Sequence, residues 1–169
     1  AAAWHANKFL DPATDGAVLP ILHLNGYKIS SPTLFARISR EELEDFFRGC
    51  GWTPRVVEGD CPQQLHQKMA AALDWAVREL QRIQAGAREL GERERPRWPM
   101  VVLCSPKGWT GPKAADGLPI EGTFRAHQLP LNLRPGRPED LDALEAWLRS
   151  YRPEELFDAN GALVPWLRE

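Results

Sequence analysis

Three short runs of this chain are rich in apolar residues and are candidate strands, separated by stretches with helical spacing. The runs cover residues 17–24, 54–58 and 100–104, and the first lies between Gly16 and Gly26. Continuous apolar runs of this length, bounded by turn residues, are typical of strands in parallel sheets. The pattern therefore predicts three strands, and it predicts that residues 17–24 are buried on both faces.

Helical spacing fills the intervals between these strands. Ser39-Arg-Glu-Glu42 has the form of a capping box, which predicts a helix that runs to about Arg48. Asp60 is the expected cap of a second helix, with Pro62 in its first turn. The apolar stripe of this helix recurs every three or four residues and comprises Leu65, Met69, Ala72, Leu73, Ala76, Leu80 and Ile83.

The order of these elements predicts the fold class. Gly91 and Pro96 end the second helix, and Pro138 begins a last helix. The apolar face of the last helix comprises Leu141, Leu144, Trp147 and Leu148. Alternating strands and helices are typical of an α/β fold, in which a parallel sheet carries helices on both faces. The 169 residues suffice for one ordinary domain with a sizeable core.

Composition argues against several classes of protein. A net charge of -2 and a pI of about 6.1 favour neither nucleic acid nor an anionic membrane as partner. Cys50, Cys61 and Cys104 are odd in number and lack CxxC spacing, so neither a disulfide framework nor zinc is indicated. No apolar stretch approaches the roughly 20 residues of a membrane span, and no signal peptide is evident. We expect a cytoplasmic chain that is a fragment of a longer polypeptide.

Polar groups follow each predicted strand. His23, Asn25, Gly26, Tyr27 and Lys28 accompany the end of the first strand. In open α/β sheets, ligands bind beyond the carboxyl ends of the strands. An amide oxygen, a flexible glycine and a cation at such an end suit a metal-bridged phosphate, and a polar turn after a core strand is the open alternative. The second strand is followed by Glu58, Gly59 and Asp60, and the third by Lys107 to Gly111.

A long segment rich in glycine and proline, residues 105–137, follows the third strand. Connections longer than about 12–15 residues are uncommon in compact domains and are usually binding loops or disordered segments. The segment contains large apolar residues, which favour an ordered active-site loop over disorder. These residues are Trp109, Ile120, Phe124 and Leu129. Its glycines and lysines do not have the spacing of a Walker loop, and His127 in it could face a ligand or be structural.

Five sequence motifs, taken in their order along the chain, are more specific than the spacing of individual residues. They are Trp-His-Ala-Asn-Lys-Phe (4–9), Asp-Gly-Ala-Val-Leu-Pro-Ile-Leu-His-Leu-Asn-Gly-Tyr-Lys-Ile (15–29), Ser-Pro-Lys-Gly-Trp-Thr-Gly-Pro-Lys (105–113), Glu-Gly-Thr-Phe-Arg-Ala-His-Gln (121–128) and Ser-Tyr-Arg-Pro-Glu-Glu-Leu-Phe (150–157). Together they resemble the phosphoketolases, thiamine-diphosphate-dependent enzymes of carbohydrate metabolism. The resemblance implies that residues 1–169 are part of one truncated pyrophosphate-binding domain, with 105–137 as its active-site loop.

The resemblance also implies roles for particular residues. It places a metal-binding asparagine at Asn25, with the main-chain oxygen of Tyr27 as companion ligand, and hard oxygen donors suit Mg²⁺ or Ca²⁺. Lys107 matches the lysine that approaches the diphosphate, and Gly26 and His23 are expected near the cofactor. His127 matches a histidine that faces the thiazolium ring and the substrate. The Gly-Asp-Gly aspartate that completes the metal site is expected upstream of Ala1.

The parent reaction implied is cleavage of xylulose 5-phosphate or fructose 6-phosphate with inorganic phosphate, giving acetyl phosphate and a shorter aldose phosphate. In this family the cofactor lies between subunits, so a second subunit of a homo-oligomer is the expected partner, and the isolated fragment is expected to be inactive. A transketolase-like thiamine enzyme and a noncatalytic phosphate-binding or structural module are the alternatives.

Overall fold

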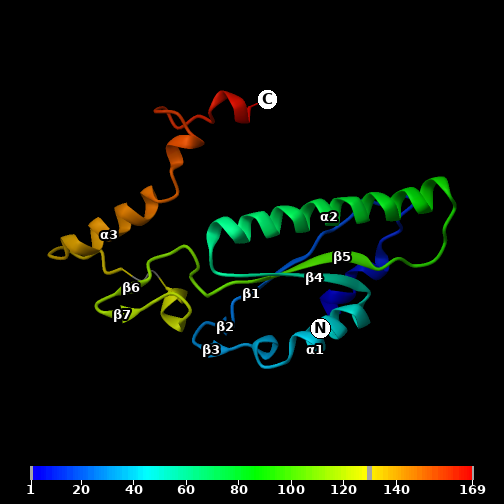
Figure 1. Ribbon diagram of the computed structural model, residues 1–169, viewed down its shortest axis with the longest axis horizontal. Helices are drawn as coiled ribbons and strands as arrows, with labels where there is room; N and C mark the ends of the chain where they lie inside the picture. Colours follow the sequence, from blue (N-terminus) through cyan, green and yellow to red (C-terminus); the bar gives the residue numbers. More distant parts are fainter. Residues whose placement is uncertain (1, 129–130, 169) are drawn as a thin grey trace.

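The computed structural model describes residues 2–128 and 131–168, in which a parallel sheet lies between helices (Figure 1). The sheet has the order β1 (Ile21–Leu24), β5 (Trp98–Cys104), β4 (Trp52–Glu58). Both neighbouring pairs are parallel, and the register aligns Leu24 and Glu58 with Cys104. The carboxyl ends of all three strands therefore meet at one edge of the sheet.

Two helices cover opposite faces of this sheet. In Figure 1, α1 (Arg40–Cys50) lies below the sheet and the long α2 (Pro62–Glu89) lies above it. A third helix, α3 (Pro138–Arg149), is set apart from the sheet. Short 3₁₀ helices complete the helical structure: η1 (Ala2–Phe9), η2 (Leu34–Ala36), η3 (Phe124–His127), η4 (Pro153–Glu155) and η5 (Pro165–Leu167).

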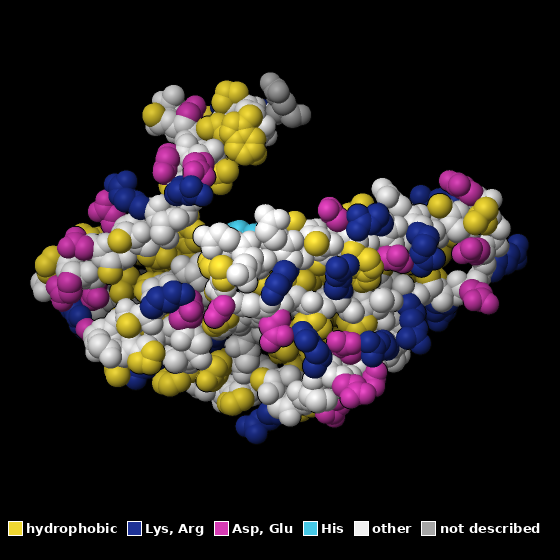
Figure 2. Space-filling view, in the orientation of Figure 1, with side chains coloured by type: hydrophobic (Ala, Val, Ile, Leu, Met, Phe, Trp, Pro, Cys, Tyr) yellow, Lys and Arg dark blue, Asp and Glu magenta, His cyan; other side chains and the backbone are white. Residues whose placement is uncertain are grey.

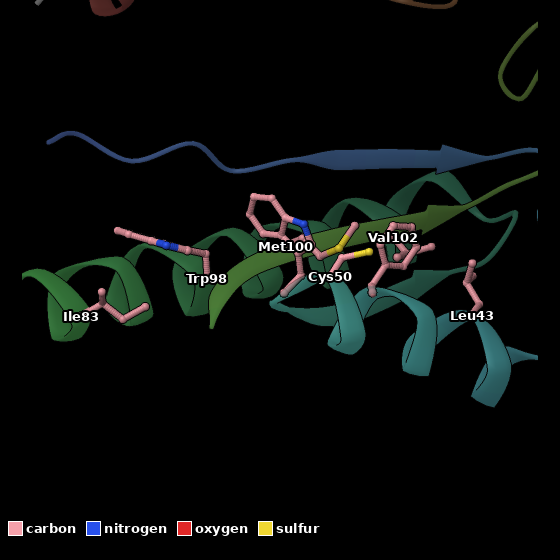
Figure 3. Close-up of a cluster of buried hydrophobic side chains, with 8 residues drawn as sticks. Leu43, Cys50, Ile83, Trp98, Met100 and Val102 are labelled. Carbon is pink, nitrogen blue, oxygen red and sulfur yellow. The ribbon is translucent and has the colours of Figure 1, made fainter. Parts of the chain in front are cut away.

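The core consists of two clusters, one on each face of the sheet. In the first, α1 packs on alternate residues of β5 such as Met100 and Val102, and Ile83 of α2 joins at the far end (Figure 3). In the second, Leu65 and Ala72 of α2 pack on Val57 and Val101. Because side chains alternate across a strand, the continuous apolar run of β5 supplies both clusters.

The strand predictions for 54–58 and 100–104 are confirmed, with each strand beginning two residues earlier than predicted. The prediction for residues 17–24 is wrong in extent and in burial. Only Ile21–Leu24 form β1, and Ile21 is 48% exposed. Among the described residues β1 pairs only with β5 and so lies at a sheet edge, whereas β5 has a neighbour on each side. Burial on both faces therefore belongs to β5.

The capping prediction for α1 is confirmed, because the Ser39 hydroxyl accepts a hydrogen bond from the Glu42 N–H at 3.1 Å. The prediction for α2 is wrong at its cap: Cys61 is the N-cap and makes no capping hydrogen bond. Asp60 instead accepts a hydrogen bond from Trp109 Nε1 through its main-chain oxygen. The stripe of α2 is buried at Leu65, Ala72, Ala76 and Ile83, but Leu73 is 37% exposed.

The segment 105–137 is more structured than the loop predicted from its composition. It contains the hairpin of β6 (Ala114–Ala115) and β7 (Leu118–Pro119), followed by η3. The predicted loop residue Leu129, with Pro130, lies outside the described residues. A second hairpin, of β2 (Tyr27–Lys28) and β3 (Ser31–Pro32), follows β1 and was not predicted.

Helix α3 begins at Pro138 as predicted, but its apolar face remains largely exposed. Leu141 and Leu148 are both exposed, and among the described residues of α3 only Asp140 is buried. Beyond α3, hydrophobic side chains gather on the C-terminal segment that projects from the body of the molecule (Figure 2), and Trp166 of this segment is exposed. Within the described part of the chain, no helix is both long enough and apolar enough to span a membrane.

Candidate functional site

The candidate site begins where β1 and β5 end side by side. Asn25 follows β1 directly, and Lys107 lies three residues after the end of β5. The parallel register pairs Leu24 with Cys104, so both residues leave the sheet at the same edge. The β2–β3 hairpin joins them, because Lys107 Nζ donates a hydrogen bond to the main-chain oxygen of Ile29 at 3.2 Å.

The Asn25–Gly26–Tyr27 turn has the local geometry of an Asx turn. Asn25 Oδ1 accepts a hydrogen bond from the Tyr27 N–H at 3.1 Å. Gly26 has a φ of 87°, a left-handed conformation that glycine adopts without steric cost. The amide oxygen retains a second lone pair for another partner. The main-chain oxygen of Tyr27 is opposite Pro32, which has no N–H to donate to it.

Lys107 is a buried cation, only 6% exposed. Its ammonium lies 6.0 Å from the centre of the Tyr27 ring and hydrogen-bonds to Ile29. Among the described residues 2–128 and 131–168, no carboxylate forms an ion pair with it. A buried ammonium with only a neutral oxygen and an aromatic face as partners is well suited to receive an anion.

Tight packing of the loop joins the residue after Lys107 to the residue before His127. The main-chain oxygen of Lys107 accepts a hydrogen bond from the Gly122 N–H at 2.8 Å, just before η3. A Cβ at Gly108 would lie 2.4 Å from the Cβ of Ala126, so only glycine allows this approach. His127, at the end of η3, is exposed.

A cleft of about 560 Å³ opens between η3 and the β2–β3 turn. Its wall includes Ile29 and Ser30 on one side and Arg125, His127 and Gln128 on the other. The turn that contacts Lys107 therefore also borders the cleft that contains His127.

His23 is exposed on β1 and shares a 2.7 Å hydrogen bond with the Ser105 hydroxyl, which lies just after β5. Other strand-end groups are engaged elsewhere. Glu58 forms an ion pair with Arg40 of α1 at 2.9 Å, and Lys113 pairs with Glu121. The ends of all three strands therefore lie at one sheet edge as predicted, and at the end of β4 the Glu58 carboxylate is already paired with a cation of this chain.

Cys104 ends β5 beside this edge. Burial raises the pKa of its thiol, and the negative charge of Glu58 raises this pKa further. A thiol whose pKa is raised carries little thiolate near neutral pH, so Cys104 is a poor nucleophile there. Cys104 is partly buried and packs against the first cluster.

A polar contact between the 105–113 string and the segment after α3 had no signal in the sequence. The Tyr151 hydroxyl lies 2.8 Å from Thr110 Oγ1 and accepts a hydrogen bond from Trp147 Nε1 at 3.0 Å. Thr110 has a φ of 69°, which is rare for a β-branched residue. Strained backbone of this kind often occurs at functional sites.

A second contact that sequence reasoning missed joins the β6–β7 hairpin to α3. Arg137 forms ion pairs with Asp116 of the hairpin at 2.5 Å and with the buried Asp140 at 3.0 Å. The hydrogen bond to Asp116, followed by the charges of Asp116 and Asp140, raises the pKa of Arg137. The side of the cleft formed by Asp116 is thereby tied to the start of the last helix.

The site supplies neutral oxygens and one buried cation. Within the described ranges, no group of three His, Cys, Asp or Glu side chains is arranged to hold a metal ion. The Asn25 amide oxygen and the Tyr27 main-chain oxygen fit two positions of a hard cation's shell, and the remaining ligands would have to come from elsewhere.

These features define a class of protein, an α/β domain with a buried cation at the carboxyl edge of a parallel sheet. Comparison with known families identifies the class more closely: residues 1–169 match the XFP N-terminal domain, and the chain belongs to this family.

Similar proteins carry a consistent name. The chain is 63% identical over 163 residues to a "Probable phosphoketolase" of Rhodopirellula baltica, an alignment that covers 96% of this chain and 21% of that protein. It is 59% identical over 169 residues to a "Probable phosphoketolase" of Clostridium acetobutylicum, covering 100% of this chain and 21% of that protein. The resemblance found in the sequence is thus confirmed, and the chain spans about a fifth of the length of these relatives.

Proposed function

We propose that this chain is part of a thiamine-diphosphate-dependent phosphoketolase. The parent enzyme would cleave xylulose 5-phosphate or fructose 6-phosphate with inorganic phosphate and release acetyl phosphate, an aldose phosphate and water. The observation that carries the proposal is the buried ammonium of Lys107, which has no carboxylate partner among the described residues and lies beside a turn of oxygen donors.

The residues of this chain would contribute binding and positioning. Asn25 Oδ1 and the main-chain oxygen of Tyr27 are proposed ligands of Mg²⁺ or Ca²⁺, because both are hard oxygen donors at the same turn. Gly26 allows the tight turn between them, and Lys107 would donate charge-assisted hydrogen bonds to the diphosphate. When bound, thiamine diphosphate supplies a carbon nucleophile and an electron sink for cleavage of the carbon–carbon bond.

His127 is the proposed catalytic residue. It is exposed beside the cleft, where an imidazole can hold or transfer a proton at an oxygen of the substrate. His23, held by Ser105 at 2.7 Å on the adjacent strand, would line the cofactor's surroundings. Since the chain spans about a fifth of its relatives, substrate groups and a second subunit of the parent homo-oligomer would complete the site.

The test uses the full-length polypeptide that contains this chain, purified without cofactor. We expect acetyl phosphate, detected as its hydroxamate, only when ketose phosphate, inorganic phosphate, Mg²⁺ and thiamine diphosphate are all present. Transfer of the two-carbon unit to an aldose without a need for inorganic phosphate would identify a transketolase instead. Absence of both reactions, together with absence of thiamine diphosphate binding, would leave a noncatalytic module.

The isolated 169-residue chain should bind thiamine diphosphate weakly or not at all. The metal ligands proposed here are neutral, and affinity for hard cations rises with the charge of the ligands. Calorimetry with Mg²⁺ and thiamine diphosphate measures this directly. Binding in the micromolar range would mean that no further ligand is needed.

A further inference from the structure

The β2–β3 turn contains a strained residue that packing does not explain. Ile29 has a φ of 55°, and a β-branched side chain at positive φ is crowded against its own carbonyl. The Ile29 residue is 56% exposed, so burial of its side chain does not compensate for this strain. Asparagine or glycine would adopt the same conformation at lower cost.

The positive φ suits the two-residue connection between β2 and β3, and it has a second consequence. It directs the main-chain oxygen of Ile29 toward Lys107, whose Nζ lies 3.2 Å away. Lys107 is the buried cation of the site, and the contact bridges 78 positions of the sequence. The ammonium has three donors, so this bond leaves two for other oxygens.

We propose that Ile29 is a positioning residue, whose strained backbone turns its carbonyl to orient the Lys107 ammonium toward a bound diphosphate. This inference rests on the proposed function, in which Lys107 binds the diphosphate. It gives a role to Ile29, which the proposed function does not mention. Ile29 also lines the cleft that contains His127. One residue thus supplies an orienting oxygen on one side of the turn and apolar surface on the other, which accounts for an isoleucine at a position where glycine would be less strained.

Two substitutions separate backbone conformation from side chain. Ile29→Pro fixes φ near -65° and turns the carbonyl away from Lys107. Proline is compatible with the site because Lys28 is in a strand, and among the described residues the Ile29 N–H makes no hydrogen bond. Ile29→Asn is the matched control, because asparagine changes the side chain but readily adopts the left-handed conformation.

The measurement is calorimetric affinity of the full-length apoenzyme for thiamine diphosphate and, separately, for inorganic pyrophosphate, both with Mg²⁺. We expect Ile29→Pro to raise both dissociation constants about tenfold, the effect of losing roughly one well-oriented hydrogen bond from a charged donor. The Ile29→Asn variant should bind both ligands with the parent's affinity. A role of the isoleucine side chain would not be rescued by asparagine, and the ester variant below separates the Ile29 carbonyl from closure of the hairpin.

A second variant keeps the test decisive if Ile29→Pro does not fold. Replacing Ser30 by its α-hydroxy acid converts the Ile29–Ser30 amide to an ester, and the ester carbonyl is a weaker acceptor while the side chains are unchanged. The described residues show no main-chain hydrogen bond donated by Ser30 that this change would remove. The same weakening of both ligands is expected.

Two results would overturn the inference: parent affinity in the folded proline or ester variants, or equal weakening by Ile29→Asn and Ile29→Pro. Lys107→Met serves as the reference for the proposed function itself. If Lys107→Met weakens diphosphate binding and the backbone variants do not, only the role of Ile29 is lost. If the parent binds neither ligand, the proposed function fails instead.

Discussion

A buried ammonium whose partners are a neutral oxygen and an aromatic ring should cost stability, which predicts an unusual outcome for Lys107→Met. Methionine preserves an unbranched apolar stem in the space of the lysine and removes the charge. The Ile29 oxygen that loses its donor belongs to an exposed residue, so water can replace the ammonium. Removal of Lys107 should therefore stabilise the chain and weaken diphosphate binding.

The magnitude follows from the contacts of the ammonium. Desolvation of a buried ammonium costs several kcal/mol even after relaxation. A hydrogen bond from a charged donor returns about 1.5–3 kcal/mol, and a cation–π contact at 6.0 Å, the limit of the effective range, returns about 0.5 kcal/mol. These terms leave Lys107 destabilising by about 1 kcal/mol. For a chain of this length, that corresponds to roughly 2–4 °C in the melting temperature.

The assay is urea unfolding of the 169-residue chain without ligand, followed by tryptophan fluorescence. We expect Lys107→Met to raise the unfolding midpoint with an unchanged slope, since the surface exposed on unfolding is the same. Lys28→Met is the control: Lys28 is exposed on the same hairpin, and its substitution should change stability by less than about 0.5 kcal/mol. A loss of about 1 kcal/mol or more in Lys107→Met would refute the reasoning, because the ammonium would then be a structural element.

Three further predictions concern catalysis, the first helix and the partly buried thiol of Cys104. His127→Ala in the full-length enzyme should lower turnover about 10²–10⁴-fold and leave the dissociation constant of thiamine diphosphate nearly unchanged, and turnover at the parent's rate would make His127 a packing residue. Ser39→Ala should lower the free energy of unfolding by about 1 kcal/mol through loss of the cap on Glu42, measured by urea unfolding; an unchanged midpoint would contradict this. Cys104 should react with iodoacetamide more slowly than free cysteine at pH 8, and its rate should rise as pH increases toward its raised pKa. A rate equal to that of free cysteine would mean that the thiol is not desolvated.

The raised pKa of Cys104 also sets the direction of a stability effect. The folded chain holds the thiol proton more tightly than the unfolded chain does. Above the pKa of an unfolded cysteine, the unfolded state therefore binds fewer protons than the folded state, and stability falls as pH rises. The contribution is fully present below that pKa, and Cys104→Ser should reduce the loss at alkaline pH.

Local patterns in the sequence were sufficient for the main elements of the fold. The capping box at Ser39, the apolar spacing of α2 and the continuous apolar run of β5 each depend on neighbours within one or two turns of the same segment. The long strings of the family likewise lie within single segments. These features determined the α/β class, two of the three strands in the sheet and the family to which the chain belongs.

Contacts between distant segments were decided only by the tertiary structure. Among the described residues β1 has a neighbour on one side alone, and the exposure of Ile21 depends on this arrangement, which its own residues do not encode. The bond between Lys107 and Ile29 depends on the parallel register of β1 and β5 and on a strained turn that no residue preference favours. Hydrophobic periodicity reports which face of an element is buried, whereas the direction of a single carbonyl is determined by the backbone of the folded chain.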